Sequence, residues 1–165
     1  MGPEPDQRVE VFHGNLIQVF VETWPQGVRE SVHHLGSAAI VALDGNDVVL
    51  IRQFRQSIRD DTLEIPAGVL DRDGESPAEC AARELREETG YRAVSVHPLG
   101  TIHTSPGFTD ERIELFIARA QREGGPEDEG IDVVLMPLAE AVRAVREGGI
   151  TDAKSAVALL LAATA

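Results

Sequence analysis

Residues 68–90 read GVLDRDGESPAECAARELREETG, and this stretch decides the fold. Its second half predicts a helix over 77–89, because Ser76 can cap the first turn, Glu79 can complete a capping box and a proline occupies the first helical position. Gly90 follows as the small residue that ends many helices in a left-handed conformation. The stretch therefore predicts a polar turn followed by a helix with two well-marked ends.

The carboxylates of this helix fall on a different face from its apolar residues. At about 100° per residue, Glu84, Glu87 and Glu88 share one face, and the apolar stripe consists of Ala78, Ala81, Ala82 and Leu85. Like charges at these spacings repel, and the helix dipole disfavours them near the C-terminal end. One interpretation is a solvated surface helix in which Arg83 and Arg86 offset the acids. The other is a site where the carboxylates share a divalent cation, which takes several oxygen ligands. The pattern alone leaves both open.

Composition limits the class of protein. A length of 165 residues and a hydrophobic content of 42% predict one globular domain with a real core. The formal net charge of −13 argues against a nucleic-acid partner, although metal cations can still bring phosphates to an acidic protein. The single cysteine, Cys80, excludes an internal disulfide, and neither a secretory signal nor a membrane-spanning run is evident. These features predict a soluble cytoplasmic protein with no membrane partner.

The rest of the chain alternates strand patterns with turn signals. Apolar and β-branched runs predict strands at 9–23, 28–35, 36–43, 47–54, 93–103, 112–120 and 131–136. Further helices are predicted over 137–149 and 152–163. Strands that interleave with three helices and outnumber them favour a mixed α/β sandwich.

The spacing G-x6-E-x7-R-E-L-x-E-E-x-G, which begins at Gly68 and ends at Gly90, resembles the Nudix box. This box is the loop–helix–loop signature of hydrolases that act on nucleoside diphosphates linked to another moiety. Two departures stand out: six residues rather than the usual five precede Glu75, and Tyr91 stands where an aliphatic residue is usual. The extra residue falls in the turn before the helix cap, so we expect the carboxylate geometry to be intact. Tyr91 can still fill an apolar site.

The resemblance implies a fold and a division of the chain. The fold is an α/β/α sandwich with a mixed sheet over 36–165, preceded by a small β-sheet element over 1–35. In the ADP-ribose pyrophosphatase branch of the family, which this chain resembles, the N-terminal strands are exchanged between the subunits of a homodimer. We therefore expect 1–35 to be a dimer-exchange element and 36–165 to be the hydrolase domain.

Segments outside the box resemble the ADP-ribose pyrophosphatase branch of the family. They are IRQFRQ and LEIPAG before the box, SPGFTDE with Pro106 at 16 residues beyond Gly90, GPEDEGIDV, and GGITDAKSAVALLL near the end. The implied activity is hydrolysis of ADP-ribose to AMP and ribose 5-phosphate, with two or more Mg²⁺ or Mn²⁺ ions in each site. The alternatives are hydrolysis of another nucleotide sugar or of a dinucleotide cofactor, or a nucleotide-binding module without turnover.

The same resemblance implies roles for individual residues. The metal ligands would be the Ala67 carbonyl, Glu84, Glu88 and Glu129. The catalytic residues would be Glu127, as the base, and Glu87, while Arg83 and Glu75 would orient the loop and helix. The substrate would contact Arg55 and Glu111 and, across the dimer interface, Arg29 and Glu30.

Without the resemblance, some of these residues have simpler interpretations. Glu127 and Glu129 would be the solvated tip of an acidic hairpin. Arg29 and Glu30 would be charges on the surface of a strand.

Overall fold

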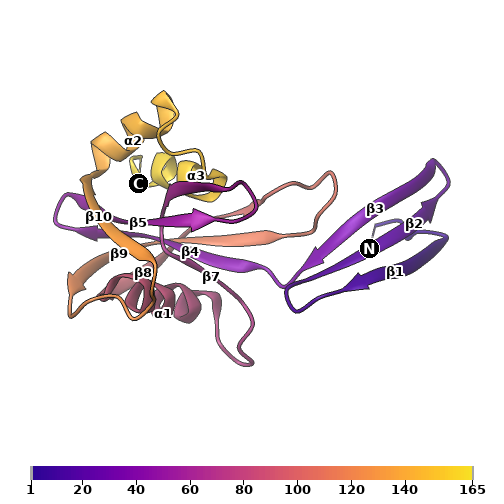
Figure 1. The fold of residues 1–165 in the computed structure, drawn as a ribbon, viewed down its shortest axis with the longest axis horizontal. Coiled ribbons are helices and arrows are strands. Elements are labelled where there is room, and N and C mark those ends of the chain that lie inside the picture. Colours follow the sequence, from indigo (N-terminus) through magenta and orange to yellow (C-terminus); the bar gives the residue numbers. More distant parts are fainter. Residues whose placement is uncertain (1, 165) are drawn as a thin grey trace.

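Ten strands and three helices occupy residues 2–164, the part of the chain that this computed structural model describes (Figure 1). In chain order they are β1 (Gln7–His13), β2 (Ile17–Trp24), β3 (Gly27–His34), β4 (Ser37–Asp44), β5 (Asp47–Arg55), β6 (Asp60–Glu64), β7 (Ala67–Val69), α1 (Pro77–Thr89), β8 (Tyr91–His103), β9 (Arg112–Arg122), β10 (Ile131–Pro137), α2 (Leu138–Glu147) and α3 (Ala153–Ala162). None of the helices in this described part has the length and apolarity that crossing a membrane requires.

The larger sheet is mixed, with the order β10-β5-β4-β9-β8. The pair β4–β9 is parallel, and the other neighbours are antiparallel. The strands β4 and β5 pair only near their turn, as far as Ala42 opposite Val49. Beyond that point they separate, and β7 pairs with residues 37–39 of β4 while β6 pairs with residues 51–55 of β5. This divergence, which we call the fork, leaves room for β7 to pair with β4 in the middle of the sheet, and β7 contains Gly68, the first residue of the box.

Helices cover both faces of this sheet (Figure 1). On one face, Ala38 and Ile40 of β4 pack in a cluster with Leu85 of α1. On the other face, Ala39 and Val41 pack in a cluster with side chains of α2 and α3. A strand buried on both faces reads as a continuous apolar run, which is how β4 reads in the sequence. The expected α/β/α sandwich with a mixed sheet is confirmed.

The first three strands form a separate antiparallel sheet that projects from the sandwich (Figure 1). Its strand β3 is tied to the loop between β8 and β9, because Val32 N donates to Phe108 O at 2.7 Å and Asp110 N donates to Val32 O at 3.2 Å. Strand β1 is exposed along its whole length and carries the apolar side chains Val9 and Phe12. The expected N-terminal sheet element is therefore present.

Helix α1 has the ends that its sequence predicts. The Ser76 side chain accepts a hydrogen bond from Glu79 N, and the Glu79 side chain accepts one from Ser76 N. Gly90 ends the helix with a φ of 73°. Tyr91 follows, only 2% exposed, in the apolar cluster beneath α1. The aromatic side chain thus fills an apolar site, as the sequence allows.

Candidate active site

The start of the Nudix-like box lies directly against the carboxylates of α1. Ala67 N donates a hydrogen bond to Glu88 Oε2 at 3.1 Å. A Cβ atom on Gly68 would lie 2.0 Å from Glu84 Oε1, so only glycine allows this approach. The extra residue before Glu75 is accommodated in a turn in which Gly74 has a φ of 79°. The longer turn therefore leaves the contact between β7 and α1 in place.

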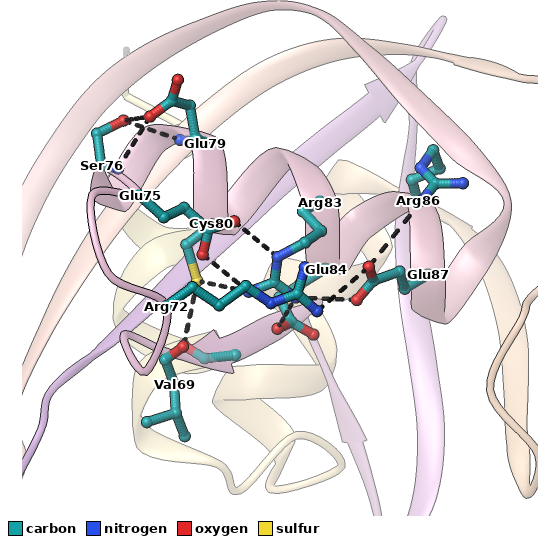
Figure 2. A network of polar contacts seen from close by, with 11 residues as sticks. Val69, Arg72, Glu75, Ser76, Glu79, Cys80, Arg83, Glu84, Arg86 and Glu87 are labelled. Atoms are coloured by element: carbon teal, nitrogen blue, oxygen red, sulfur yellow. Dashed lines mark hydrogen bonds and ion pairs between the residues drawn. The ribbon is translucent and has the colours of Figure 1, made fainter.

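Arg83 links the acids of the box into one network (Figure 2). Its Nε and Nη2 donate to the two oxygens of Glu75 at 2.7 and 2.9 Å. Its Nη1 donates to Glu84 at 2.5 Å and to Glu87 at 2.9 Å. The hydrogen bond to Glu75, followed by those to Glu84 and Glu87, raises the pKa of Arg83, which is charged at any physiological pH. Arg83 therefore acts as the counter-ion of this face.

Burial disfavours the charged form of two box carboxylates, Glu88 and Glu84. Glu88 is 7% exposed, and desolvation raises its pKa to about 8. The hydrogen bond from Ala67 opposes this shift, whereas the charges of Glu84 and Asp128 add to it. Desolvation also raises the pKa of Glu84, against the opposing effect of Arg83. A site of this kind would gain from additional positive charge.

The donor chemistry of the box fits a hard divalent cation. The available groups are carboxylate and carbonyl oxygens, which Mg²⁺ and Mn²⁺ prefer. Within residues 2–164, no three acidic, histidine or cysteine side chains converge as a ready cation site. The reason is visible in Figure 2, where Glu84 and Glu87 turn toward Arg83.

The late acidic loop docks on the C-terminal end of α1. Glu127 N donates to the Glu87 carbonyl at 2.7 Å, and Asp128 N approaches the same oxygen at 3.3 Å. The Glu127 carboxylate forms an ion pair with Arg86, and its side chain is 54% exposed. Glu129 is exposed at the tip of the loop. The structure thus brings the loop to the box, while the Glu127 carboxylate is paired away from the buried acids.

The middle residue of the loop triplet, Asp128, is not among the site residues that the resemblance implies. Its charge raises the pKa of both Glu84 and Glu88, so it lies within electrostatic range of the buried acids. The only sequence signal was its position between Glu127 and Glu129. Periodicity could not show which of the three carboxylates influences the buried acids, because a loop has no regular repeat.

A cleft of about 370 Å³ opens beside Ala67 and Gly68. Two expected substrate residues, Arg55 and Glu111, line it. Arg55 donates to Glu64 at 2.7 and 2.6 Å, and Glu111 accepts a hydrogen bond from Thr104 at 2.7 Å. The fork therefore places this cleft beside Ala67 and Gly68, the residues that pack against Glu88 and Glu84.

The other two expected substrate residues lie elsewhere in the chain. Arg29 and Glu30 line a separate cleft of about 490 Å³, between the N-terminal sheet and the loop that contains Pro106 and Phe108. Within a single chain the structure does not bring them to the box.

Comparisons with known proteins agree with this geometry. A family model described as the NUDIX domain matches residues 33–159. The chain is 37% identical over 161 residues to a "Methanol dehydrogenase activator" of Bacillus methanolicus, across 91% of this chain and 86% of that protein. It is 36% identical, with the same coverage, to an "ADP-ribose pyrophosphatase" of Bacillus subtilis strain 168. It is also 40% identical over 146 residues to a "GDP-mannose pyrophosphatase" of Cronobacter sakazakii, across 79% of this chain and 75% of that protein.

A solved structure described as an ADP compounds hydrolase has the same fold. It superposes with a TM-score of 0.81 at 22% sequence identity, over 99% of this chain and 94% of that one. Because the box, the layered fold and the match over residues 33–159 coincide, the chain belongs to the NUDIX domain family.

Proposed function

We propose that this protein hydrolyses the diphosphate of ADP-ribose to AMP and ribose 5-phosphate. The observation that carries the proposal is the packing of Ala67 and Gly68 against Glu84 and Glu88, next to a cleft that Arg55 lines. Membership of the NUDIX family makes a pyrophosphohydrolase the class of enzyme. The relative named as an ADP-ribose pyrophosphatase supports the choice of substrate.

Oxygens of the box, of Ala67 just before it and of the late acidic loop would hold the metal. We assign the Ala67 carbonyl, Glu84, Glu88 and Glu129 as ligands of Mg²⁺ or Mn²⁺, with two or more ions in each site. Bound divalent cations neutralise diphosphate oxygens and lower the pKa of water. Glu84 would exchange its contact with Arg83 for this role, and Arg83 would keep its bidentate contact with Glu75.

The proposed base is Glu127, with Glu87 beside it. Its carboxylate would take the proton of the water that attacks one phosphorus, as the bridging P–O bond breaks in line. In this structure Glu127 pairs with Arg86 on the outside of α1, so the base would have to turn inward. Glycines on both sides of the triplet, Gly125 and Gly130, give the loop the freedom to do so.

Substrate contacts would come from two subunits of a homodimer. Arg55 and Glu111 line the cleft in the same chain. Arg29 and Glu30 would complete the site of the partner, with 1–35 as the exchanged element and 36–165 as the hydrolase domain. The exposed apolar side chains of β1 support this assembly, because a partner would bury them. We expect the enzyme to work in the cytoplasm, where Cys80 stays reduced.

A second nucleotide sugar, GDP-mannose, is the principal alternative substrate. The relative named as a GDP-mannose pyrophosphatase is 40% identical over 146 residues, compared with 36% over 161 residues for the relative named as an ADP-ribose pyrophosphatase. Both substrates present a diphosphate between a nucleoside and a sugar, so the same box would serve either. A nucleotide-binding module without turnover is the non-enzymatic alternative.

A panel assay separates these functions. The wild-type protein is incubated with ADP-ribose or GDP-mannose, with Mg²⁺ or with EDTA, and the release of AMP or GMP is measured. We expect Mg²⁺-dependent release of AMP with the higher kcat/KM. Faster release of GMP would reassign the substrate, and binding of ADP-ribose without release of AMP would leave only a binding module. The Glu84→Gln/Glu88→Gln double variant is the control for a contaminating hydrolase.

A further inference from the structure

The end of β6 carries the most deeply buried carboxylate of the cleft region. Glu64 is 2% exposed and lies on the arm of the fork formed by β5 and β6. The next residue, Ile65, donates its N–H to Ser155 Oγ of α3 at 2.8 Å. Glu64 is thus fixed between the sheet and the last helix, three positions before Ala67, the residue that precedes the box.

Hydrogen-bond donors occupy both oxygens of Glu64. Arg55 Nε donates to Oε1 at 2.7 Å, and Arg55 Nη2 donates to Oε2 at 2.6 Å. The Thr62 hydroxyl also donates to Oε1, and Lys154 Nζ donates to Oε2. Burial alone would raise the pKa of Glu64, but these contacts lower it to about 2. The group therefore stays charged and is not available as a metal ligand or as a proton carrier.

The bidentate contact leaves part of Arg55 exposed. The Arg55 side chain is 41% exposed and lines the cleft, whereas Glu64 lies behind it. The contact uses Nε and Nη2, so the Nη1 edge of the guanidinium is left to face a ligand. A guanidinium held along one edge has few rotamers left to lose when a phosphate binds to the other.

Lys154 holds Glu64 through Oε2, the oxygen that also accepts from Arg55 Nη2. Its Nζ also donates to Asp152 at 2.9 Å, and its side chain is 10% exposed. Two cations and two carboxylates therefore alternate, and the formal charge of the cluster formed by Arg55, Glu64, Lys154 and Asp152 is zero. A neutral cluster stabilises the position of Arg55 without repelling the metal ions that the box would hold.

We propose that Glu64 is a positioning residue that acts through Arg55, with Lys154 as its second clamp. This inference rests on the proposed function, in which Arg55 contacts the diphosphate. Glu64 would not touch the substrate. Its role would be to present the free edge of Arg55 to the diphosphate at a fixed distance from Ala67 and Gly68.

The test is a double-mutant cycle between Glu64→Gln and Arg55→Ala. The amide of Glu64→Gln keeps one acceptor but loses the charge that fixes the guanidinium. We expect Glu64→Gln to raise the KM for ADP-ribose about tenfold to hundredfold, with kcat changed little, because charge-assisted hydrogen bonds are lost. In the Arg55→Ala background the same substitution should have no further effect on KM. Equal effects in both backgrounds, or an unchanged KM in folded Glu64→Gln, would overturn the inference.

Two controls keep a loss of folding separate from a loss of positioning. Glu114→Gln is the matched variant, because Glu114 also pairs with an arginine, at 2.8 Å from Arg112, and accepts from a threonine, at 2.7 Å from Thr101, but does not line the cleft. Its KM should stay that of the wild type. Glu64→Asp keeps the charge and replaces Glu64→Gln in the cycle if the latter does not fold.

The affinity for ADP-ribose in EDTA, measured by calorimetry, gives a readout that does not depend on turnover. If the wild type binds ADP-ribose but does not hydrolyse it, the proposed function fails while the cycle can still be completed on Kd. If Kd of Glu64→Gln equals that of the wild type, the positioning role fails whatever the activity.

Discussion

Substitution of Gly68 by alanine tests the contact that organises the box. The added Cβ would lie 2.0 Å from Oε1 and 2.1 Å from Cδ of Glu84. Gly68 does not need a left-handed backbone, since it is not among the glycines with positive φ, so the effect is steric and falls on Glu84. Glu84 must leave its rotamer and loosen its ion pair with Arg83, in which the two side chains are only 16% and 13% exposed.

The expected cost follows from these distances. Overpacking of this kind costs about 1–3 kcal/mol in the free energy of unfolding, which corresponds to a fall in Tm of roughly 2–12 °C for a chain of this size. A catalytic group displaced by an ångström loses about a hundredfold in rate. We therefore expect Gly68→Ala to remain folded and to lose about a hundredfold in kcat for ADP-ribose.

The assay is AMP release at increasing Mg²⁺, together with a thermal melt. Gly149→Ala is the matched control, because its Cβ would meet its nearest neighbour, the Ala144 carbonyl oxygen, at an ordinary 3.5 Å. Wild-type kcat and Tm in Gly68→Ala would refute the reasoning, since Glu84 would then occupy another position in the working enzyme. A lower Tm with an unchanged kcat would refute the metal-ligand role of Glu84 alone.

Four further outcomes can be measured. Glu84→Gln and Glu88→Gln should each lower kcat roughly 10²–10³-fold with a normal melting curve, and near-normal rates at saturating Mg²⁺ would contradict their assignment as ligands. Glu127→Gln should lower kcat about 10²-fold or more with unchanged metal affinity, whereas an unchanged rate would move the base to Asp128 or Glu129. The pKa of Glu64 is lowered from 4.5 to about 2, so its contribution of about 3 kcal/mol to folding should be complete above pH 4.5 and lost as the pH falls toward 2. In urea titrations, the difference in the free energy of unfolding between wild type and Glu64→Gln should shrink over that range. A difference that stays constant with pH would exclude the ion pair as its source. Phe12→Glu places a charge on the exposed apolar face of β1 and should yield monomers in light scattering, with loss of activity. A dimer that persists in this variant would contradict the assignment of that face to the interface.

Local rules explain what could be predicted from the sequence. The caps of α1 depend on Ser76, Glu79 and Gly90, which lie within or beside the helix that they delimit. The central strand β4 is apolar at successive positions because helices cover both faces of the sheet. The helical projection at about 100° per residue places the carboxylates on one side of α1, which needs no knowledge of the rest of the chain.

Contacts between distant segments could not be predicted in the same way. The strands β6 and β7 are only five and three residues long, and their pairing depends on the fork rather than on their own pattern. Glu64 lies in the segment LEIPAG, outside every strand that the sequence predicts, and its clamp, Lys154, lies 90 positions away. The side-chain directions of Glu127 and Asp128 depend on how the loop docks on α1, which no periodicity encodes.

The fork also limits how this enzyme could be redesigned. One arm, β5 with β6, carries Arg55, which is proposed to contact the diphosphate, and Glu64, which holds it. The other arm, β4 with β7, carries Gly68, the first residue of the box. A chimaera that takes residues 47–64 from a relative with another sugar preference would leave the box intact. The contacts of this segment with Lys154 and Ser155 would nevertheless be kept as a matched set only if residues 151–155 were taken from the same relative. The natural unit of exchange is therefore a discontinuous pair of segments rather than one stretch of chain.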